Sequence, residues 1–324
     1  MGKRGEFDLI AELFAPLSNL DQGLGLTDDG ALFVPQPGHS VVLTTDTLLA
    51  GVHYLADDPA DSLARKALRV NLSDLAAMGA LARGYLLNLA IPSALGDDWL
   101  EGFAAGLAID QRAFGVTLLG GDTVGTVGPG MISITALGEV RIGRALRRST
   151  ARPGDDIYVT GTIGDALAGL RVLQGGAALT SAHAEALIDR YRLPRPRTTV
   201  GPRLVGLATA AIDVSDGLVA DLGHICTTSK VAAVVEADAV PRSEALGAAI
   251  SSGLLTAVDA LGGGDDYELL FCAPPEVREA VRRVSETTKT PIATIGRVVA
   301  GSGVRVVGAD GADIEIGHPG HVHF

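Results

Sequence analysis

Cysteine and lysine are scarce in this chain, and the shortage of cysteine excludes two classes of protein. The sequence has two cysteines, Cys226 and Cys272, which stand far apart and form no Cys-x-x-Cys pair. This pattern excludes a disulfide framework and a zinc site made of cysteine pairs, and it favours buried thiols in a reducing compartment. Residues 1–30 show no signal-peptide pattern, and apolar runs such as 85–92 are too short to cross a bilayer. We therefore expect a cytoplasmic protein outside the membrane.

Positive charge is also in short supply. The formal net charge is -12 at pH 7, with 20% charged and 47% hydrophobic residues. An acidic surface repels the phosphates of nucleic acids, so no nucleic-acid partner is expected. It repels free ATP as well, so an acidic protein that handles polyphosphates has to bind cations too. The hydrophobic content is that of a globular protein, and 324 residues suffice for two ordinary domains.

The common nucleotide-binding signatures are missing. There is no GxxxxGK[ST] loop, no GxGxxG opening a βαβ unit and no HRD or DFG set. None of the four lysines follows a glycine-rich loop. Phosphate charge would therefore be met by metal ions, backbone amides and arginine. Arg144, Arg147 and Arg148 form one compact basic group, although a solvated surface run explains it equally well.

Strands and helices alternate in both halves of the chain, which predicts an α/β protein. Turn residues cluster at 151–155, so we expect two α/β domains, residues 1–148 and 149–324. The strands are expected at 41–45, 116–119, 131–139, 157–160, 210–212 and 268–272. The helices are expected at 61–79, 97–114, 164–173 and 218–225.

Aspartates gather at the predicted strand ends and glycine-rich turns, where α/β proteins build their sites. One more, Asp74, lies in the helix that begins near residue 61. Carboxylates in such numbers suit Mg²⁺, which binds hard oxygen ligands and phosphates. A single Asp-Gly is also an ordinary turn, so the hypothesis depends on the number of these aspartates. They are Asp28, Asp29, Asp46, Asp122, Asp213, Asp216, Asp265 and Asp266.

No Ser-His-Asp or Cys-His set is evident for nucleophilic catalysis. Ser215 lies between Asp213 and Asp216, and the nearest following histidine, His224, lies across a predicted helix. We interpret Ser215 as a phosphate or metal contact, not as a nucleophile.

Ten short motifs occur in a fixed order along the chain. They are 28–31 (DDGA), 44–47 (TTDT), 51–54 (GVHY), 66–68 (KAL), 71–80 (NLSDLAAMGA), 120–123 (GGDT), 143–146 (GRAL), 157–161 (IYVTG), 211–225 (AIDVSDGLVADLGHI) and 263–269 (GGDDYEL). In this order they resemble the thiamine-monophosphate kinase family of the aminoimidazole-ribonucleotide-synthetase-like superfamily. The resemblance runs from about residue 5 to the end, and motifs 71–80 and 263–269 are its most specific parts.

This resemblance implies an activity and an assembly. The activity is direct in-line transfer of the γ-phosphoryl group of ATP to thiamine monophosphate, which gives thiamine diphosphate, the last step of its biosynthesis, and needs several Mg²⁺ ions. Residues 1–148 would form the ATP- and metal-binding and dimerisation domain. The N-terminal sheets of two subunits would join into a barrel across a homodimer.

The resemblance also assigns roles to residues, none of them a covalent nucleophile. The implied ligands of Mg²⁺ or nucleotide phosphates are Asp29, Thr44, Thr45, Asp46, Asp74, Asp122, Asp213 and Asp216. The implied contacts to ATP are Gly121, Asp122, Arg148 and Ser215. The implied contacts to the thiamine compound are His53, Asp265 and His321.

Two positions depart from the family pattern, and two alternative functions stay open. Thr27 replaces a glycine, and His321 replaces an aromatic residue. One alternative is another ATP-using enzyme of the superfamily. Selenophosphate synthetase needs a reactive Cys or selenocysteine with a lysine near the N-terminus, and Lys3 has no such companion. The hydrogenase-maturation enzyme ends in cysteine, whereas this chain ends in Phe324. The other alternative is a non-catalytic nucleotide or metal sensor.

Overall fold

The computed structural model describes residues 6–176, 179–317 and 320. The chain divides into two compact units. Unit 1 comprises residues up to 75 together with 80–143, and unit 2 comprises 76–79 together with 144–324. The domain boundary predicted between residues 148 and 149 falls slightly after the division at Gly143 and Arg144.

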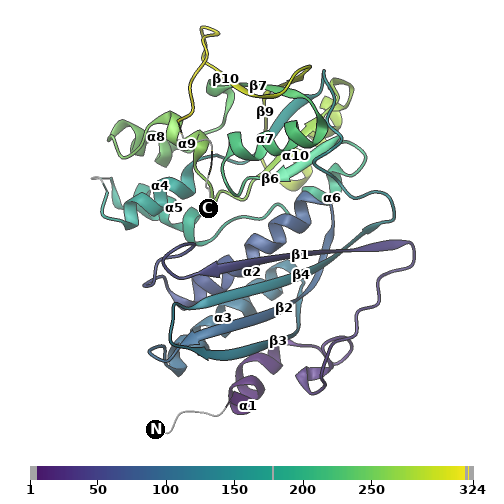
Figure 1. The fold of residues 1–324 in the computed structure, drawn as a ribbon, viewed down its shortest axis with the longest axis vertical. Helices are drawn as coiled ribbons and strands as arrows, with labels where there is room; N and C mark the ends of the chain where they lie inside the picture. Colours follow the sequence, from purple (N-terminus) through teal and green to yellow (C-terminus); the bar gives the residue numbers. More distant parts are fainter. Residues whose placement is uncertain (1–5, 177–178, 318–319, 321–324) are drawn as a thin grey trace. The chain divides into compact units, whose positions relative to one another are not determined.

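Unit 1 is a four-stranded sheet with two long helices on one face (Figure 1). Its strands are β1 (His39–Leu49), β2 (Leu81–Pro92), β3 (Thr117–Thr126) and β4 (Met131–Arg141). Its helices are α1 (Glu6–Leu9), α2 (Ala60–Ala77) and α3 (Asp97–Phe114). The strand order is β1-β4-β2-β3, with β2 and β3 parallel and the other pairs antiparallel. β1 and β3 are therefore the two edges of the sheet.

The two faces of this sheet differ in burial. The helix-facing side carries buried side chains such as Leu48, Leu87 and Ile134. The opposite side carries exposed ones, among them Leu43 at 65% and Val124 at 49% exposure. Successive strand residues point to opposite faces, so one strand supplies both kinds.

Helices α2 and α3 are joined by an ion cluster as well as by apolar packing. The carboxylate of Asp110 on α3 is fully buried and accepts hydrogen bonds from Arg65 and Arg69 on α2. Replacing Asp110 would leave two arginines without their buried acceptor, which destabilises the packing of the two helices. The cluster thus fixes the helix layer that carries Asp74.

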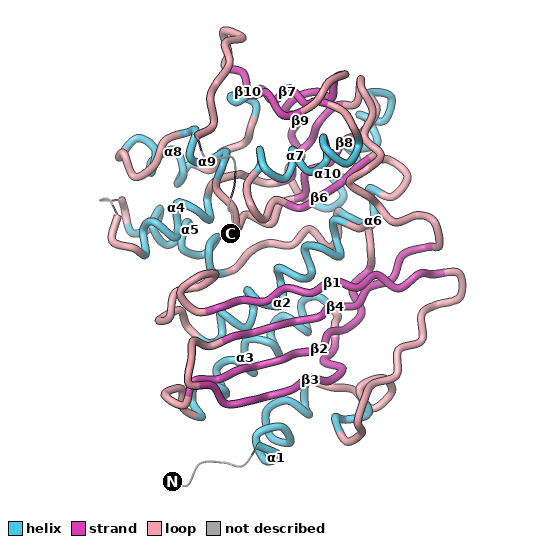
Figure 2. Tube along the Cα trace, in the orientation of Figure 1, coloured by secondary structure: helices cyan, strands magenta, loops and turns pink. Residues whose placement is uncertain are grey.

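Unit 2 is a six-stranded sheet in the order β10-β7-β9-β5-β8-β6, surrounded by shorter helices (Figure 2). Its strands are β5 (Asp156–Thr160), β6 (Ala210–Asp213), β7 (Ala232–Glu236), β8 (Leu269–Ala273), β9 (Ile292–Val299) and β10 (Gly303–Val307). Its helices are α4 (Asp165–Leu173), α5 (Ser181–Arg192), α6 (Gly201–Leu204), α7 (Leu218–Ser229), α8 (Glu244–Ser251), α9 (Ala257–Gly262) and α10 (Arg278–Thr288).

The core of unit 2 lies on both faces of the β5, β8 and β6 end of its sheet. Every residue of β5, β6 and β8 is buried. Cys226 and Cys272 are buried and free, as the sequence predicted. Among the described helices, none combines the length and apolar character needed to cross a membrane.

Two strand ends were placed wrongly from the sequence. We predicted that strands stop at Asp46 and at 120–122, but β1 continues to Leu49 and β3 to Thr126. Asp46 and Asp122 therefore lie inside strands. Glycine at 121 permits this pairing, because a Cβ there would lie 1.8 Å from the carbonyl oxygen of Leu87 on β2.

Candidate active site

Three of the predicted ligands meet on the helix-facing side of unit 1. Thr44 and Asp46 point from β1 toward α2, where the Thr44 hydroxyl donates a hydrogen bond to Asp74. The backbone N–H of Asp46 donates to Asn71 Oδ1 at 3.1 Å, so motif 71–80 fixes β1 as well as carrying Asp74. This group, Thr44, Asp46 and Asp74, is called the β1–α2 carboxylate group below.

The electrostatics of the β1–α2 carboxylate group suit a divalent cation. Burial, and then the nearby Asp74 carboxylate, raise the pKa of Asp46 to about 7. Two close carboxylates without a cation disfavour each other's charged form. All the side-chain donors of the group are oxygens, which are the ligands that Mg²⁺ prefers. These residues therefore fit Mg²⁺.

His53 lies in the turn that follows β1. Its Nδ1 accepts a hydrogen bond from the backbone N–H of Leu49 at 3.0 Å. In the neutral ring the proton is then on Nε2. Lys66, buried on α2, points its Nζ to the His53 carbonyl oxygen at 3.5 Å. The lysine of motif 66–68 thus supports the turn that carries His53.

A second group of predicted ligands lies on the open side of the sheet. Asp29, Gly121 and Asp122 line a hollow of about 450 Å³, together with Asp28 and apolar side chains such as Leu86. Asp122 is exposed and stands in register with Asn88 of β2. Motif 28–31 and motif 120–123 therefore lie side by side around this hollow.

The structure keeps these two groups apart. β4 and β2 lie between β1 and β3, so three strand spacings, or about 14 Å, separate Asp46 from Asp122. Thr45 points away from Asp46, and its hydroxyl donates to the Ile134 carbonyl oxygen at 3.1 Å. One copy of unit 1 thus does not bring Asp46 and Asp122 to one metal ion.

In unit 2 the predicted ligands lie on the loop between β6 and α7. Asp213 ends β6 and is buried, and Ser215 and Asp216 follow it. Three successive backbone N–H groups, those of residues 215–217, donate to one oxygen of Asp221 at 3.0, 3.1 and 3.1 Å. Asp221 therefore shapes this loop.

Sequence reasoning assigned no role to Asp221. The available signal was its place in the first turn of α7, where a carboxylate accepts free N–H groups. Burial, and then Asp216, raise the pKa of Asp221 to about 7. One donor atom each of Asp216, Asp221 and His224 lie within 4.8 Å of one another.

A second loop, residues 263–268, interlocks with the first. The N–H of Asp265 donates to the Ser215 carbonyl oxygen, and that of Tyr267 donates to Val214, both at 2.8 Å. Asp265 and Tyr267 have φ of 69° and 52°, the left-handed region that L residues rarely adopt. The Tyr267 hydroxyl lies 3.2 Å from Asp265 Oδ1. The predicted substrate contact Asp265 is thus attached to the predicted metal and ATP ligands of unit 2.

Two predicted contacts are not part of these groups. The carbonyl oxygen of Arg148 accepts hydrogen bonds from Thr228 and Ser229, at the C-terminal end of α7. Ser215 precedes the other end of this helix, which is about 18 Å long. The exposed Arg148 side chain stays a predicted ATP contact. His321 lies outside the described residues.

Comparison with known proteins identifies the family of this chain. The family model for the N-terminal domain of AIR synthase related proteins matches residues 27–140, and that for the C-terminal domain matches 152–309. Thiamine-monophosphate kinase of Salmonella typhimurium is 43% identical over 99% of this chain and 98% of its own length. This chain belongs to the thiamine-monophosphate kinase family.

Solved structures of the thiamine-monophosphate kinase family share the fold. The crystal structure of thiamine-monophosphate kinase from Stenotrophomonas maltophilia K279a has a TM-score of 0.85 and 44% identity, covering 96% of this chain and 98% of its own. AaThiL complexed with AMPPCP and TMP has a TM-score of 0.79 and 32% identity, covering 98% and 97%. The family inferred from the motifs is confirmed, and so is the α/β fold class inferred from the alternation of strands and helices.

Proposed function

We propose that this protein transfers the γ-phosphoryl group of ATP to thiamine monophosphate and releases thiamine diphosphate and ADP. The observation that carries this proposal is the match along nearly the whole chain to thiamine-monophosphate kinases at 43–44% identity. The two carboxylate-rich groups of unit 1 and the interlocked loops of unit 2 supply the polar residues that such a reaction needs.

The reaction requires that the protein orient its two substrates, and it requires no covalent nucleophile from the protein. The acceptor is a phosphate oxygen of thiamine monophosphate, which attacks the γ-phosphorus of ATP in line as the bond to the β-phosphate oxygen breaks. We assign His53 of unit 1 and Asp265 of unit 2 as contacts to thiamine monophosphate, and Ser215 of unit 2 as a contact to ATP. Orientation of this kind supplies much of the rate.

Several acidic residues would hold metal ions in this site. Thr44, Asp46 and Asp74 form one donor set, and Asp213 and Asp216 belong to another. When bound, Mg²⁺ supplies positive charge that offsets the repulsion among carboxylates and phosphates.

A turnover assay tests the function directly. The full chain, ATP, Mg²⁺ and thiamine monophosphate are expected to give thiamine diphosphate and ADP in equal amounts, measured by chromatography. Tight binding of both compounds without any product would favour a non-catalytic sensor. ATP hydrolysis that leaves thiamine monophosphate unchanged would favour another enzyme of the superfamily.

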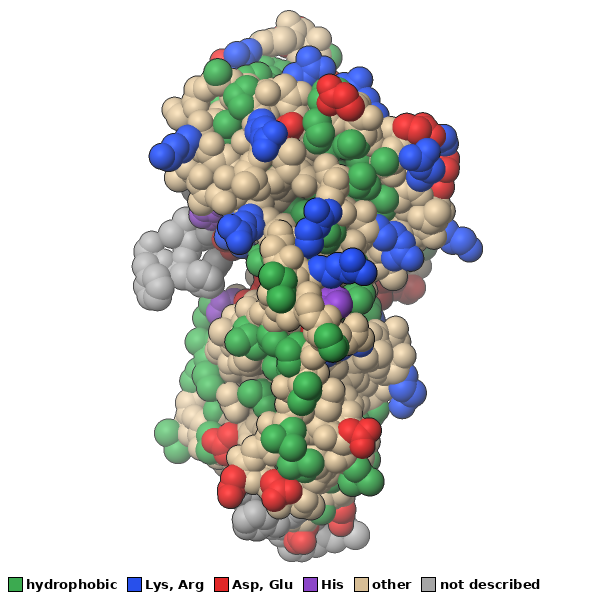
Figure 3. Space-filling model, turned by 90° about the vertical axis from the view of Figure 1, so that its right-hand side faces the viewer, with side chains coloured by type: hydrophobic (Ala, Val, Ile, Leu, Met, Phe, Trp, Pro, Cys, Tyr) green, Lys and Arg blue, Asp and Glu red, His purple; other side chains and the backbone are tan. Residues whose placement is uncertain are grey.

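We also propose a homodimer formed through unit 1. The exposed large hydrophobic side chains of the described residues all lie in unit 1. The face drawn in Figure 3 carries hydrophobic side chains spread over this unit. The sheet has two unpaired edges, β1 and β3, which invite pairing with another copy. Closing two such sheets into a barrel places β3 of one copy beside β1 of the other.

The mass of the protein in solution tests the dimer. Light scattering of the full chain at micromolar concentration is expected to give the mass of two copies, because one closed barrel needs the sheets of two subunits. A stable monomer under these conditions would contradict the proposed dimer.

A further inference from the structure

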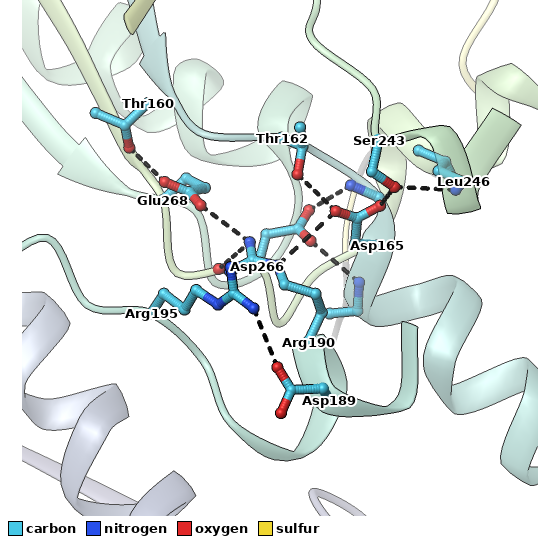
Figure 4. A network of polar contacts seen from close by, with 12 residues as sticks. Thr160, Thr162, Asp165, Asp189, Arg190, Arg195, Ser243, Leu246, Asp266 and Glu268 are labelled. Atoms are coloured by element: carbon cyan, nitrogen blue, oxygen red, sulfur yellow. Dashed lines mark hydrogen bonds and ion pairs between the residues drawn. The ribbon is translucent and has the colours of Figure 1, made fainter. Parts of the chain in front are cut away.

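Glu268 is a fully buried carboxylate that directly precedes β8 and ends the 263–268 loop. Its two oxygens accept hydrogen bonds from both arginines that face it and from one hydroxyl (Figure 4 shows two of these contacts). Arg190 Nη2 lies 2.9 Å from Oε1, and Arg197 Nε and Thr160 Oγ1 lie 2.5 Å from Oε2. A second nitrogen of Arg197 also contacts Oε1, which makes a two-point contact.

The residues around Glu268 come from two motifs that the proposed function leaves partly unexplained. Thr160 and Gly161 end motif 157–161, and the Thr160 hydroxyl also accepts a hydrogen bond from the N–H of Leu269. Gly161 has φ of 58°, and a Cβ there would lie 2.2 Å from Glu268 Oε1. A side chain at 161 would therefore displace the carboxylate.

Asp266 fixes the middle of the same loop. Its side chain is fully buried and accepts hydrogen bonds from the N–H groups of Gly164 at 2.6 Å and Ala166 at 3.2 Å. Arg190 donates to the carbonyl oxygen of Asp266 at 3.4 Å. The side chains of residues 266 and 268 are thus buried, the first held by backbone N–H groups and the second by arginines. Residues 265 and 267, which alternate with them, adopt the rare positive φ.

We propose that Arg197 and Glu268 are positioning residues for thiamine monophosphate, because their two-point contact holds the 263–268 loop in the strained form that presents Asp265. This inference rests on the proposed function, with Asp265 as a substrate contact. Neither residue needs to touch the substrate. Glu268 holds the loop end, and Arg197, whose side chain is 18% exposed, prevents the carboxylate from turning.

Arg197→Gln is the informative variant, because it leaves Glu268 paired with Arg190 and Thr160 and so preserves a folded core. We expect the KM for thiamine monophosphate to rise about tenfold, as in the direct-contact variant Asp265→Asn. The KM for ATP is expected to change less than twofold and kcat less than threefold. Arg197→Lys keeps the charge but makes one contact, and it is expected to recover part of the affinity.

Asp156→Asn provides a matched control. Asp156 begins β5, the strand that ends at Thr160, and its buried carboxylate makes a two-point contact with Arg278. This variant removes a buried carboxylate's charge from the same unit but at the opposite end of the strand. It is expected to lower the melting temperature and to leave the KM for thiamine monophosphate unchanged.

Two measurements besides activity complete the test. Calorimetry is expected to show weaker binding of thiamine monophosphate to Arg197→Gln, and hydrogen exchange is expected to speed up at the amides of Asp265 and Tyr267. If Arg197→Gln matches Asp156→Asn in melting temperature, KM and exchange at these amides, the arginine is only structural and the proposal is wrong. Failure of the proposed function is a different result, since wild-type protein would then make no thiamine diphosphate.

Discussion

Removing divalent metal with EDTA is expected to lower the rate of phosphoryl transfer more than about 1000-fold, equivalent to about 4 kcal/mol. The reason lies in the β1–α2 carboxylate group, where Asp46 and Asp74 already oppose each other's ionisation. The polyphosphate of ATP adds further negative charge to a chain whose own net charge is already -12. Activity is measured in metal-free buffer and again after Mg²⁺ is added in excess.

The control is EDTA saturated with Mg²⁺ beforehand, which is expected to leave the rate unchanged. Full activity in free EDTA would contradict metal-assisted transfer.

The pH dependence gives a further check. Without metal, Asp46 has a pKa of about 7, so below this pH Mg²⁺ competes with a proton for the carboxylate. The half-saturating Mg²⁺ concentration is therefore expected to rise from pH 8 to pH 6, by at most about tenfold per unit.

Local sequence patterns predicted much of the fold, because apolar residues recur at different spacings in helices and in strands. The predicted helix at 97–114 has the bounds of α3, and Asp74 lies on α2 as expected. β2 was missed, since its run 81–92 contains Arg83 and Gly84 near the start and reads as an apolar stretch without alternation. β2 lies between β4 and β3 and pairs with both. This pairing joins residues that are far apart in the sequence, so no local pattern predicts it.

The chemical nature of the site was easier to predict than its geometry. Carboxylates in glycine-rich motifs indicated metal and phosphate binding, but the face on which a strand residue points depends on where the strand pairs. For this reason Thr44 and Thr45, which are neighbours in the sequence, take different sides of the sheet. The supports Asp221 and Glu268 were missed because their partners are backbone N–H groups or distant arginines.

Asp122→Asn is expected to lower kcat at least about 100-fold, a loss of about 2.7 kcal/mol of transition-state stabilisation. The amide keeps the size of the side chain and removes the negative charge that would hold a metal ion against the phosphates. Because Asp122 is exposed on β3, beside Asp29 in the open hollow, the fold is expected to remain intact. Steady-state kinetics with each substrate varied in turn, and circular dichroism, measure both properties.

Asp98→Asn is the matched control for this change. Asp98 is also an exposed aspartate of unit 1, in the first turn of α3, far along the chain from every predicted ligand. Loss of a carboxylate near a helix N-terminus costs only about 0.3–1 kcal/mol of stability, and no loss of kcat is expected. If Asp122→Asn stayed within about threefold of wild type, under about 1 kcal/mol, Asp122 would be a strand residue without a metal.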